Sequence, residues 1–165
     1  MKSIRLQAIK KSGKKNLFII PYIFTFLNAC FGFLSIIKTL EFDFVMAAYC
    51  IILAACMDLL DGRLARAFGS TSCFGMELDS LCDAISFCLA PAILLYNWYL
   101  TDLDLVGFVV LSFYICAGLS RLARFNIGIH TNKMFFVGLP TPVAAFLMSE
   151  FVLHSTWIDG SIFSF

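Results

Sequence analysis

The stretch 58–83 reads D-L-L-D-G-R-L-A-R-A-F-G-S-T-S-C-F-G-M-E-L-D-S-L-C-D, and it sets four aspartates and two arginines inside an otherwise apolar chain. Asp58 and Asp61 are three residues apart and Asp79 and Asp83 four apart, so on helices each pair lies on one face, a turn apart. Two such helices facing each other would converge four carboxylates on one point. Buried carboxylates must be paired or bind a metal. The stretch therefore predicts a divalent-cation site.

The rest of the chain has the composition of a membrane protein. Hydrophobic residues make up 61% of the 165 residues and charged residues only 14%, where a soluble domain carries about 25% charged residues. Five apolar runs approach the length that a spanning helix needs; they lie near 17–37, 44–57, 84–100, 105–120 and 135–153. We expect an all-α, polytopic transmembrane bundle of about five spans. A soluble bundle is the alternative, but so small a chain has too little interior for five such runs.

The N-terminal end is strongly basic and predicts the orientation of the chain. It holds six of the twelve lysines and arginines, namely Lys2, Arg5, Lys10, Lys11, Lys14 and Lys15. The positive-inside rule places this end in the cytoplasm, and the absence of a convincing small-residue cleavage site predicts an uncleaved anchor. We divide the chain into a basic juxtamembrane segment, 1–15, and a transmembrane domain, 16–165. Threading the spans from there places the aspartates and R-L-A-R-F-N (121–126) at the cytoplasmic face of the cell membrane.

Written as a pattern, the aspartate stretch is D-x2-D-G-x2-A-R-x8-G-x3-D-x3-D, which resembles the signature of the CDP-alcohol phosphotransferase family. Other stretches resemble one branch of it, the bacterial and archaeal phosphatidylserine synthases: T-F-L-N-A-C-F-G-F (25–33), F-G-M-E-L-D-S-L-C-D-A-I-S-F (74–87), A-P-A (90–92), R-L-A-R-F-N (121–126) and G-L-P-T-P (138–142). Two departures stand out. Tyr22 stands where these enzymes usually carry Asn, and the family typically has six spans. The domain is therefore expected to be C-terminally incomplete or a shortened member.

The resemblance implies roles for the four aspartates. Asp58, Asp61 and Asp79 would be the principal ligands of two Mg²⁺ or Mn²⁺ ions, which are hard cations that take carboxylate oxygens. Two such ions could polarise phosphoryl oxygens and stabilise a departing nucleotide. Asp83 would either complete the second metal site or accept the proton of the alcohol. Glu77 fits neither pair's spacing and is not expected to be a ligand.

Small and polar residues around the aspartates are expected to contact CDP or its phosphates. The glycines and the alanine lack bulk and let a ligand approach the backbone, while the arginine offers a planar group to phosphate. Ordinary helix packing is the alternative for the small residues. With two residues of the first span that the resemblance adds, the set is Gly62, Ala65, Arg66, Gly75, Thr25 and Asn28.

The segment R-L-A-R-F-N carries a second candidate site. Arg121 and Arg124 are three residues apart, so both could face one pocket and bind the carboxylate of serine or the lipid-linked phosphate. Snorkelling to the headgroup layer is the alternative. Asn126 is a weaker candidate for the same role.

These observations predict transfer of a phosphatidyl group from CDP-diacylglycerol to L-serine, with release of CMP. A sibling enzyme that uses glycerol phosphate or an inositol compound is one alternative, and a divalent-cation transporter is another, because intramembrane carboxylates suit it equally. An ion path, however, has no use for a phosphate-facing arginine beside its cations. Membrane lipids and a second copy of the chain, in a homodimer, are the expected partners, and no nucleic acid is expected.

Overall fold

The computed structural model describes residues 19–69, 72–130 and 139–162, so the basic segment 1–15 lies outside the described residues. Every element within the described ranges is helical. In chain order these are α2 (Ile19–Leu40), α3 (Phe44–Phe68), α4 (Cys73–Asp83), the π-helical η1 (Ala84–Leu89), α5 (Ala90–Trp98), the short 3-10 helix η2 (Leu100–Leu103), α6 (Asp104–His130) and α7 (Thr141–Ile162). The predicted all-α architecture is confirmed.

Within the described ranges, four helical stretches are long and apolar enough to cross a membrane: Pro21–Leu40, Phe44–Phe68, Cys73–Trp98 and Asp104–Ile127. They contain most of the first four predicted apolar runs, and the chain is a polytopic helical membrane protein. Most of the fifth run forms α7, which begins at Thr141 between the two prolines of G-L-P-T-P. α7 is not among the four stretches, so a fifth span stays a prediction.

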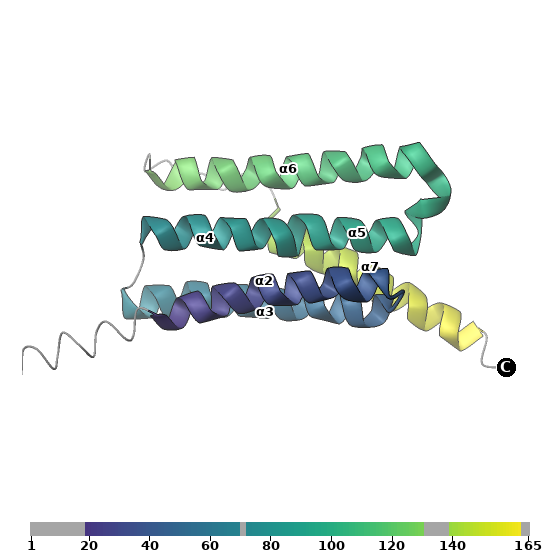
Figure 1. Ribbon diagram of the computed structural model, residues 1–165, viewed down its shortest axis with the longest axis horizontal. Helices are drawn as coiled ribbons and strands as arrows, with labels where there is room; N and C mark the ends of the chain where they lie inside the picture. The colour runs from purple at the N-terminus through teal and green to yellow at the C-terminus, as the bar shows by residue number, and fades with distance from the viewer. Residues whose placement is uncertain (1–18, 70–71, 131–138, 163–165) are drawn as a thin grey trace, which may run out of the picture.

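The helices form a bundle around a central rod. Figure 1 shows α4, η1 and α5 as one continuous rod, with α6 along one side of it and the pair α2 and α3 along the other. α7 packs against α3 and α5. The first turns of α4 and the last turns of α6 lie at the same end of the bundle (Figure 1), and η2 lies at the opposite end. The aspartate stretch and the end of α6 therefore share one end.

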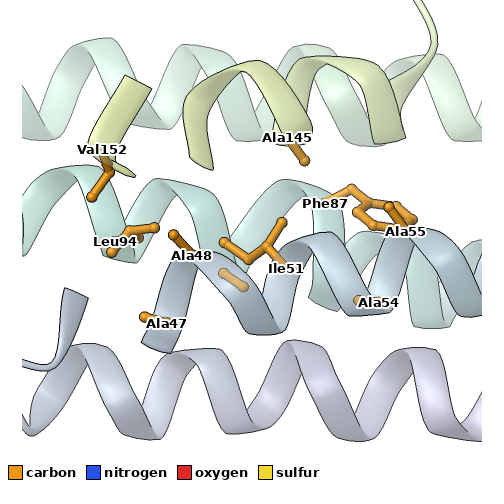
Figure 2. Packing of buried hydrophobic residues seen from close by; sticks show 10 residues of the cluster. Ala47, Ala48, Ile51, Ala54, Ala55, Phe87, Leu94, Ala145 and Val152 are labelled. Carbon is orange, nitrogen blue, oxygen red and sulfur yellow. The ribbon is translucent and has the colours of Figure 1, made fainter. Parts of the chain in front are cut away.

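Small side chains allow the helices of the core to approach closely. One face of α3 is lined by Ala47, Ala48, Ala54 and Ala55, all buried. Figure 2 shows this face meeting side chains of η1, α5 and α7. Many large apolar side chains point outward, among them Phe113, which is 74% exposed. In a bilayer such side chains meet lipid, and association of helices depends on close packing of small residues.

The rod changes its hydrogen-bond pattern before Pro91. A proline has no N–H, so the carbonyl of Phe87, four residues earlier, cannot receive its ordinary helical bond. The hydroxyl of Tyr114 on α6 donates to this carbonyl at 2.7 Å. The π-helical segment Ala84–Leu89 ends just before the proline. The helix thus changes register next to Pro91, and the neighbouring helix satisfies the released carbonyl.

Candidate active site

A turn between α3 and α4 brings the two parts of the aspartate stretch together. α3 ends at Phe68 and is capped by Gly69, whose φ of 59° is left-handed and therefore favours glycine. α4 begins after Ser72, whose Oγ accepts from the N–H of Gly75 at 3.0 Å and so caps the helix. α3 and α4 run in opposite directions (Figure 1), so carboxylates from the two helices can meet.

Three of the four aspartates converge. Carboxylate oxygens of Asp58, Asp61 and Asp79 all lie within 4.8 Å of one another. Asp58 and Asp61 come from successive turns of α3, and Asp79 comes from α4. Asp61 is buried and the other two are half-buried. We call these three residues the carboxylate cluster.

Asp83 lies outside the carboxylate cluster but next to it. It is the last residue of α4 and is only 7% exposed. Its Oδ1 accepts a hydrogen bond from Nδ2 of Asn28 on α2 at 3.0 Å. The structure thus gives the fourth aspartate different surroundings from those of the other three.

The carboxylate cluster fits a divalent cation. Three carboxylates this close repel one another if all are ionised, and a bound cation offsets that repulsion. Asp61 Oδ2 and Asp79 Oδ1 are buried and have no hydrogen-bond partner among the described residues. Buried polar atoms without a partner are rare and call for an explanation. Oxygen donors of this kind suit Mg²⁺ and Mn²⁺.

The residues expected to contact CDP differ in how much open space lies beside them. Beside Gly62 the space is open, since a Cβ placed there would meet no atom within 4 Å. Ala65 is half-buried and Arg66 is exposed, with its Nε donating to the carbonyl of Gly62 at 3.0 Å. Gly62 and Arg66 therefore border open space next to Asp61, as contact with a ligand requires.

Gly75 has a different reason to lack a side chain. A Cβ at this position would lie 3.1 Å from Cε1 of Tyr22 and 3.2 Å from Oγ of Ser72. The structure therefore favours the packing alternative for Gly75 over approach of a ligand.

Thr25 and Asn28, on the first span, are both buried. Thr25 Oγ1 donates to the carbonyl of Pro21 at 3.2 Å, an ordinary bond within a helix. The Asn28 side chain is 0% exposed. Neighbouring residues enclose the Asn28 side chain, and its expected contact with CDP stays a prediction.

The three polar residues of R-L-A-R-F-N have different surroundings. Arg121 is half-buried, and its Nη1 donates to Oγ1 of Thr141 at the start of α7. Arg124 is exposed. The two arginines are therefore not equivalent, although they lie three residues apart.

Asn126 bridges two helices. Its Oδ1 accepts from Ser80 Oγ at 3.0 Å, and its Nδ2 donates to Glu77 Oε2 at 3.1 Å. Both partners belong to α4. Asn126 thus fixes the end of α6 beside the helix that carries Asp79.

Sequence reasoning missed several residues of this region. Ser72 carries a recognisable signal, because a serine directly before a helix predicts an N-cap. Thr141 and Ser86 carry none. Ser86 Oγ donates to the carbonyl of Asn28 at 2.9 Å, across 58 residues of chain. Contacts at such separation depend on how the helices pack, which no local pattern reports.

Comparisons with known proteins assign the chain to a family. The sequence model described as CDP-alcohol phosphatidyltransferase matches residues 18–162. The chain is 38% identical over 138 residues to the CDP-diacylglycerol–serine O-phosphatidyltransferase of Helicobacter pylori, with 83% of this chain and 58% of the relative covered. It is 39% identical over 144 residues to the archaetidylserine synthase of Methanothermobacter thermautotrophicus, covering 86% of this chain and 61% of the relative.

A relative from Methanocaldococcus jannaschii, also named CDP-diacylglycerol–serine O-phosphatidyltransferase, is 40% identical over 152 residues, covering 92% of this chain and 69% of the relative. The chain spans less than two thirds of the length of the Helicobacter and Methanothermobacter relatives. The match nevertheless includes the whole aspartate stretch and every helix described above. The chain belongs to the CDP-alcohol phosphatidyltransferase family.

Proposed function

We propose that this protein transfers a phosphatidyl group from CDP-diacylglycerol to L-serine and releases CMP. The observation that carries the proposal is the carboxylate cluster, in which three aspartates of the family signature come within 4.8 Å of one another. The names of the relatives support serine as the acceptor. The name of the Methanothermobacter relative also contains serine, which supports the same acceptor headgroup.

In the proposed reaction the serine hydroxyl attacks the phosphorus that carries diacylglycerol. A new bond forms between the serine oxygen and phosphorus, and the bond from phosphorus to the CMP oxygen breaks. The serine proton goes to a carboxylate, for which Asp83 is our candidate, and from there to water. Asp83 suits this role because it lies beside the carboxylate cluster but outside it.

Asp58, Asp61 and Asp79 would hold Mg²⁺ or Mn²⁺, as two ions if Asp83 also contributes. A divalent cation bound there supplies positive charge to the phosphoryl oxygens and to the departing nucleotide. The open space beside Gly62 and the exposed Arg66 lie on the same helix. We assign the pyrophosphate to this side, because guanidinium matches phosphate geometry.

We place the site at the cytoplasmic face of the cell membrane, with the acyl chains remaining in the bilayer. The distribution of basic residues supports this orientation, since six of them precede residue 16. A homodimer, which the family resemblance implies, completes the proposal.

Product analysis with the purified protein tests the proposal directly. The protein is incubated with CDP-diacylglycerol, Mg²⁺ or Mn²⁺ and one alcohol at a time: L-serine, glycerol 3-phosphate or inositol 1-phosphate. We expect phosphatidylserine and CMP in equal amounts with serine only, and no product with excess EDTA. Product from another alcohol but not from serine would mean that the acceptor is that alcohol and that the class of reaction is unchanged. No CMP release with any alcohol would reject the proposal.

A further inference from the structure

Two hydrogen bonds tie Asn28 to the end of α4 and the start of η1. The side-chain Nδ2 donates to Oδ1 of Asp83 at 3.0 Å, and the main-chain carbonyl accepts from Ser86 Oγ at 2.9 Å. The backbones are also close one turn further along α2, where a Cβ on Gly32 would lie 2.7 Å from Cα of Ser86. The position of Asn28 relative to Asp83 is therefore set by main-chain packing as well as by the side chains.

The amide of Asn28 suits a carboxylate acceptor that must keep one orientation. An NH₂ group only donates, so it binds one oxygen of the Asp83 carboxylate and limits rotation of that group. The side chain of Asn28 is 0% exposed, so water cannot compete for the bond. Its Oδ1 is buried and has no hydrogen-bond partner in the part of the chain that the structure describes. An unpaired buried carbonyl costs stability, which argues that Asn28 has a use other than stabilising the fold.

We propose that Asn28 is a positioning residue for Asp83: its amide holds Oδ1 and so fixes the orientation of the carboxylate that accepts the proton of the acceptor alcohol. The proposal rests on the proposed function, in which Asp83 accepts the proton. It differs from the expectation that Asn28 contacts CDP, because in this arrangement the asparagine touches neither substrate.

The test uses two substitutions that remove the donor. Asn28→Leu is nearly isosteric, apolar and free of the unpaired carbonyl, so it suits the buried site; Asn28→Ala is the second variant. Each should lower kcat for phosphatidylserine formation by about 10- to 100-fold, the range for losing a hydrogen bond to a charged group. The KM for CDP-diacylglycerol should change less than about threefold. The matched control is Ser86→Ala, which removes the other bond to Asn28 and leaves the Asp83 amide contact in place.

A double-mutant cycle separates positioning from a structural role. Asp83→Asn keeps the shape of the side chain and an oxygen that can accept from Asn28, but it removes the base. If Asn28 acts through Asp83, Asn28→Leu should lower the residual rate of the Asp83→Asn enzyme by less than about twofold. An equal loss of kcat in both backgrounds would mean that Asn28 only supports the fold, and would overturn the proposal.

Three other results would also overturn it. A raised KM for CDP-diacylglycerol with an unchanged kcat would instead support the expected contact between Asn28 and CDP. Unchanged kinetics in both Asn28 variants would remove the role of Asn28 while leaving the proposed function intact. An absence of serine-dependent CMP release in the unmodified protein would instead remove the proposed function and, with it, this role. Thermal unfolding of each variant, compared with the unmodified protein, identifies rates that fall because the protein is unfolded.

Discussion

At the scale of single residues, the carboxylate cluster is placed for activity but lowers the stability of the fold. Two full charges 4.8 Å apart repel by about 3 kcal/mol at an effective dielectric constant of about 20. Without a cation, these three residues therefore destabilise the folded protein. Residues placed for chemistry commonly carry such a cost.

Asn substitutions should separate these two effects. Asp58→Asn, Asp61→Asn or Asp79→Asn should each lower the rate by about 100-fold or more, because charge stabilisation by a metal is worth several kcal/mol. In EDTA the same variants should unfold at a higher temperature than the unmodified protein, by about 2–4 °C for each kcal/mol of relieved repulsion. Thermal unfolding with and without Mg²⁺ measures this. Lower stability of the variants in EDTA would contradict the close approach of three ionised carboxylates.

A second residue-scale prediction concerns Arg121 and Arg124. If one of them binds the carboxylate of serine, replacement by Lys loses the planar fork and should raise the serine KM by about 10- to 100-fold. The KM for CDP-diacylglycerol should move far less, and serinol, which lacks the carboxylate, should be a poor acceptor. A rise only in the CDP-diacylglycerol KM would assign the arginines to the lipid phosphate.

Thr141→Val provides the control for Arg121. It removes the hydroxyl that accepts from Arg121 but keeps the guanidinium. If Thr141→Val reproduces the kinetics of Arg121→Lys, the arginine joins α6 to α7 and does not bind serine. The Thr141→Val control applies to Arg121, whereas Arg124 is exposed.

The spacing of the aspartates in the sequence predicted that they converge. The contacts that spacing did not predict have physical reasons. The intervals of three and four residues put Asp58 beside Asp61 and carried Asp79 to the same place, because helical periodicity is local. The roles of Asn28 and Gly75 depend on contacts with residues about fifty positions away in the chain. A family pattern marks such positions but does not say whether a ligand or a neighbouring helix occupies the space.

At the scale of elements, the start of α4 depends on a short polar contact. The hydroxyl of Tyr22 on α2 is hydrogen-bonded to Ser72 Oγ at 2.8 Å, and Ser72 Oγ also caps α4. The ring of Tyr22 meets Phe74 edge to face, with centroids 6.1 Å apart. Tyr22, which replaces the usual Asn, therefore holds the first turn of the helix that carries Asp79.

Removing the cap should loosen this turn. Ser72→Ala should cost about 1 kcal/mol, the usual value for an N-cap, and should raise the Mg²⁺ concentration needed for half activity by several fold. Tyr22→Phe keeps the cap and the ring, so its effect should be smaller. Ser120→Ala, at an exposed position on α6, is the control and should leave both quantities unchanged. Equal effects of Ser72→Ala and Ser120→Ala on the Mg²⁺ requirement would show that the cap does not position Asp79.

At the scale of the whole molecule, the spans were predictable but their arrangement was not. Apolar runs predict helices, because in lipid each backbone polar group must be satisfied within its own helix. Which helices pack against each other depends on the side chains of their faces, and buried and lipid-facing faces have similar hydropathy. Ala47 and Ala54 are buried on α3 and Phe113 is exposed on α6, yet all three count as apolar. Helices pack together where small residues let their backbones approach closely.

Orientation in the membrane is the last prediction and rests on charge alone. With the basic N-terminal end inside, the start of α4 should face the cytoplasm, and the α5–α6 connection should face outward. Two single-cysteine proteins test this in a background in which the other cysteines are replaced by Ala or Ser. One keeps Cys73, which is exposed at the start of α4, and the other carries Thr101→Cys, at an exposed position in η2.

In intact cells, a membrane-impermeant maleimide should label the Thr101→Cys protein and should label Cys73 only after the membrane is opened. Both proteins must retain phosphatidylserine formation, which excludes misfolded material as the source of the signal. Labelling of Cys73 in intact cells, with protection of the Thr101→Cys protein, would reverse the orientation. The carboxylate cluster would then face away from the cytoplasm, so this outcome would also oppose the cytoplasmic site in the proposed function.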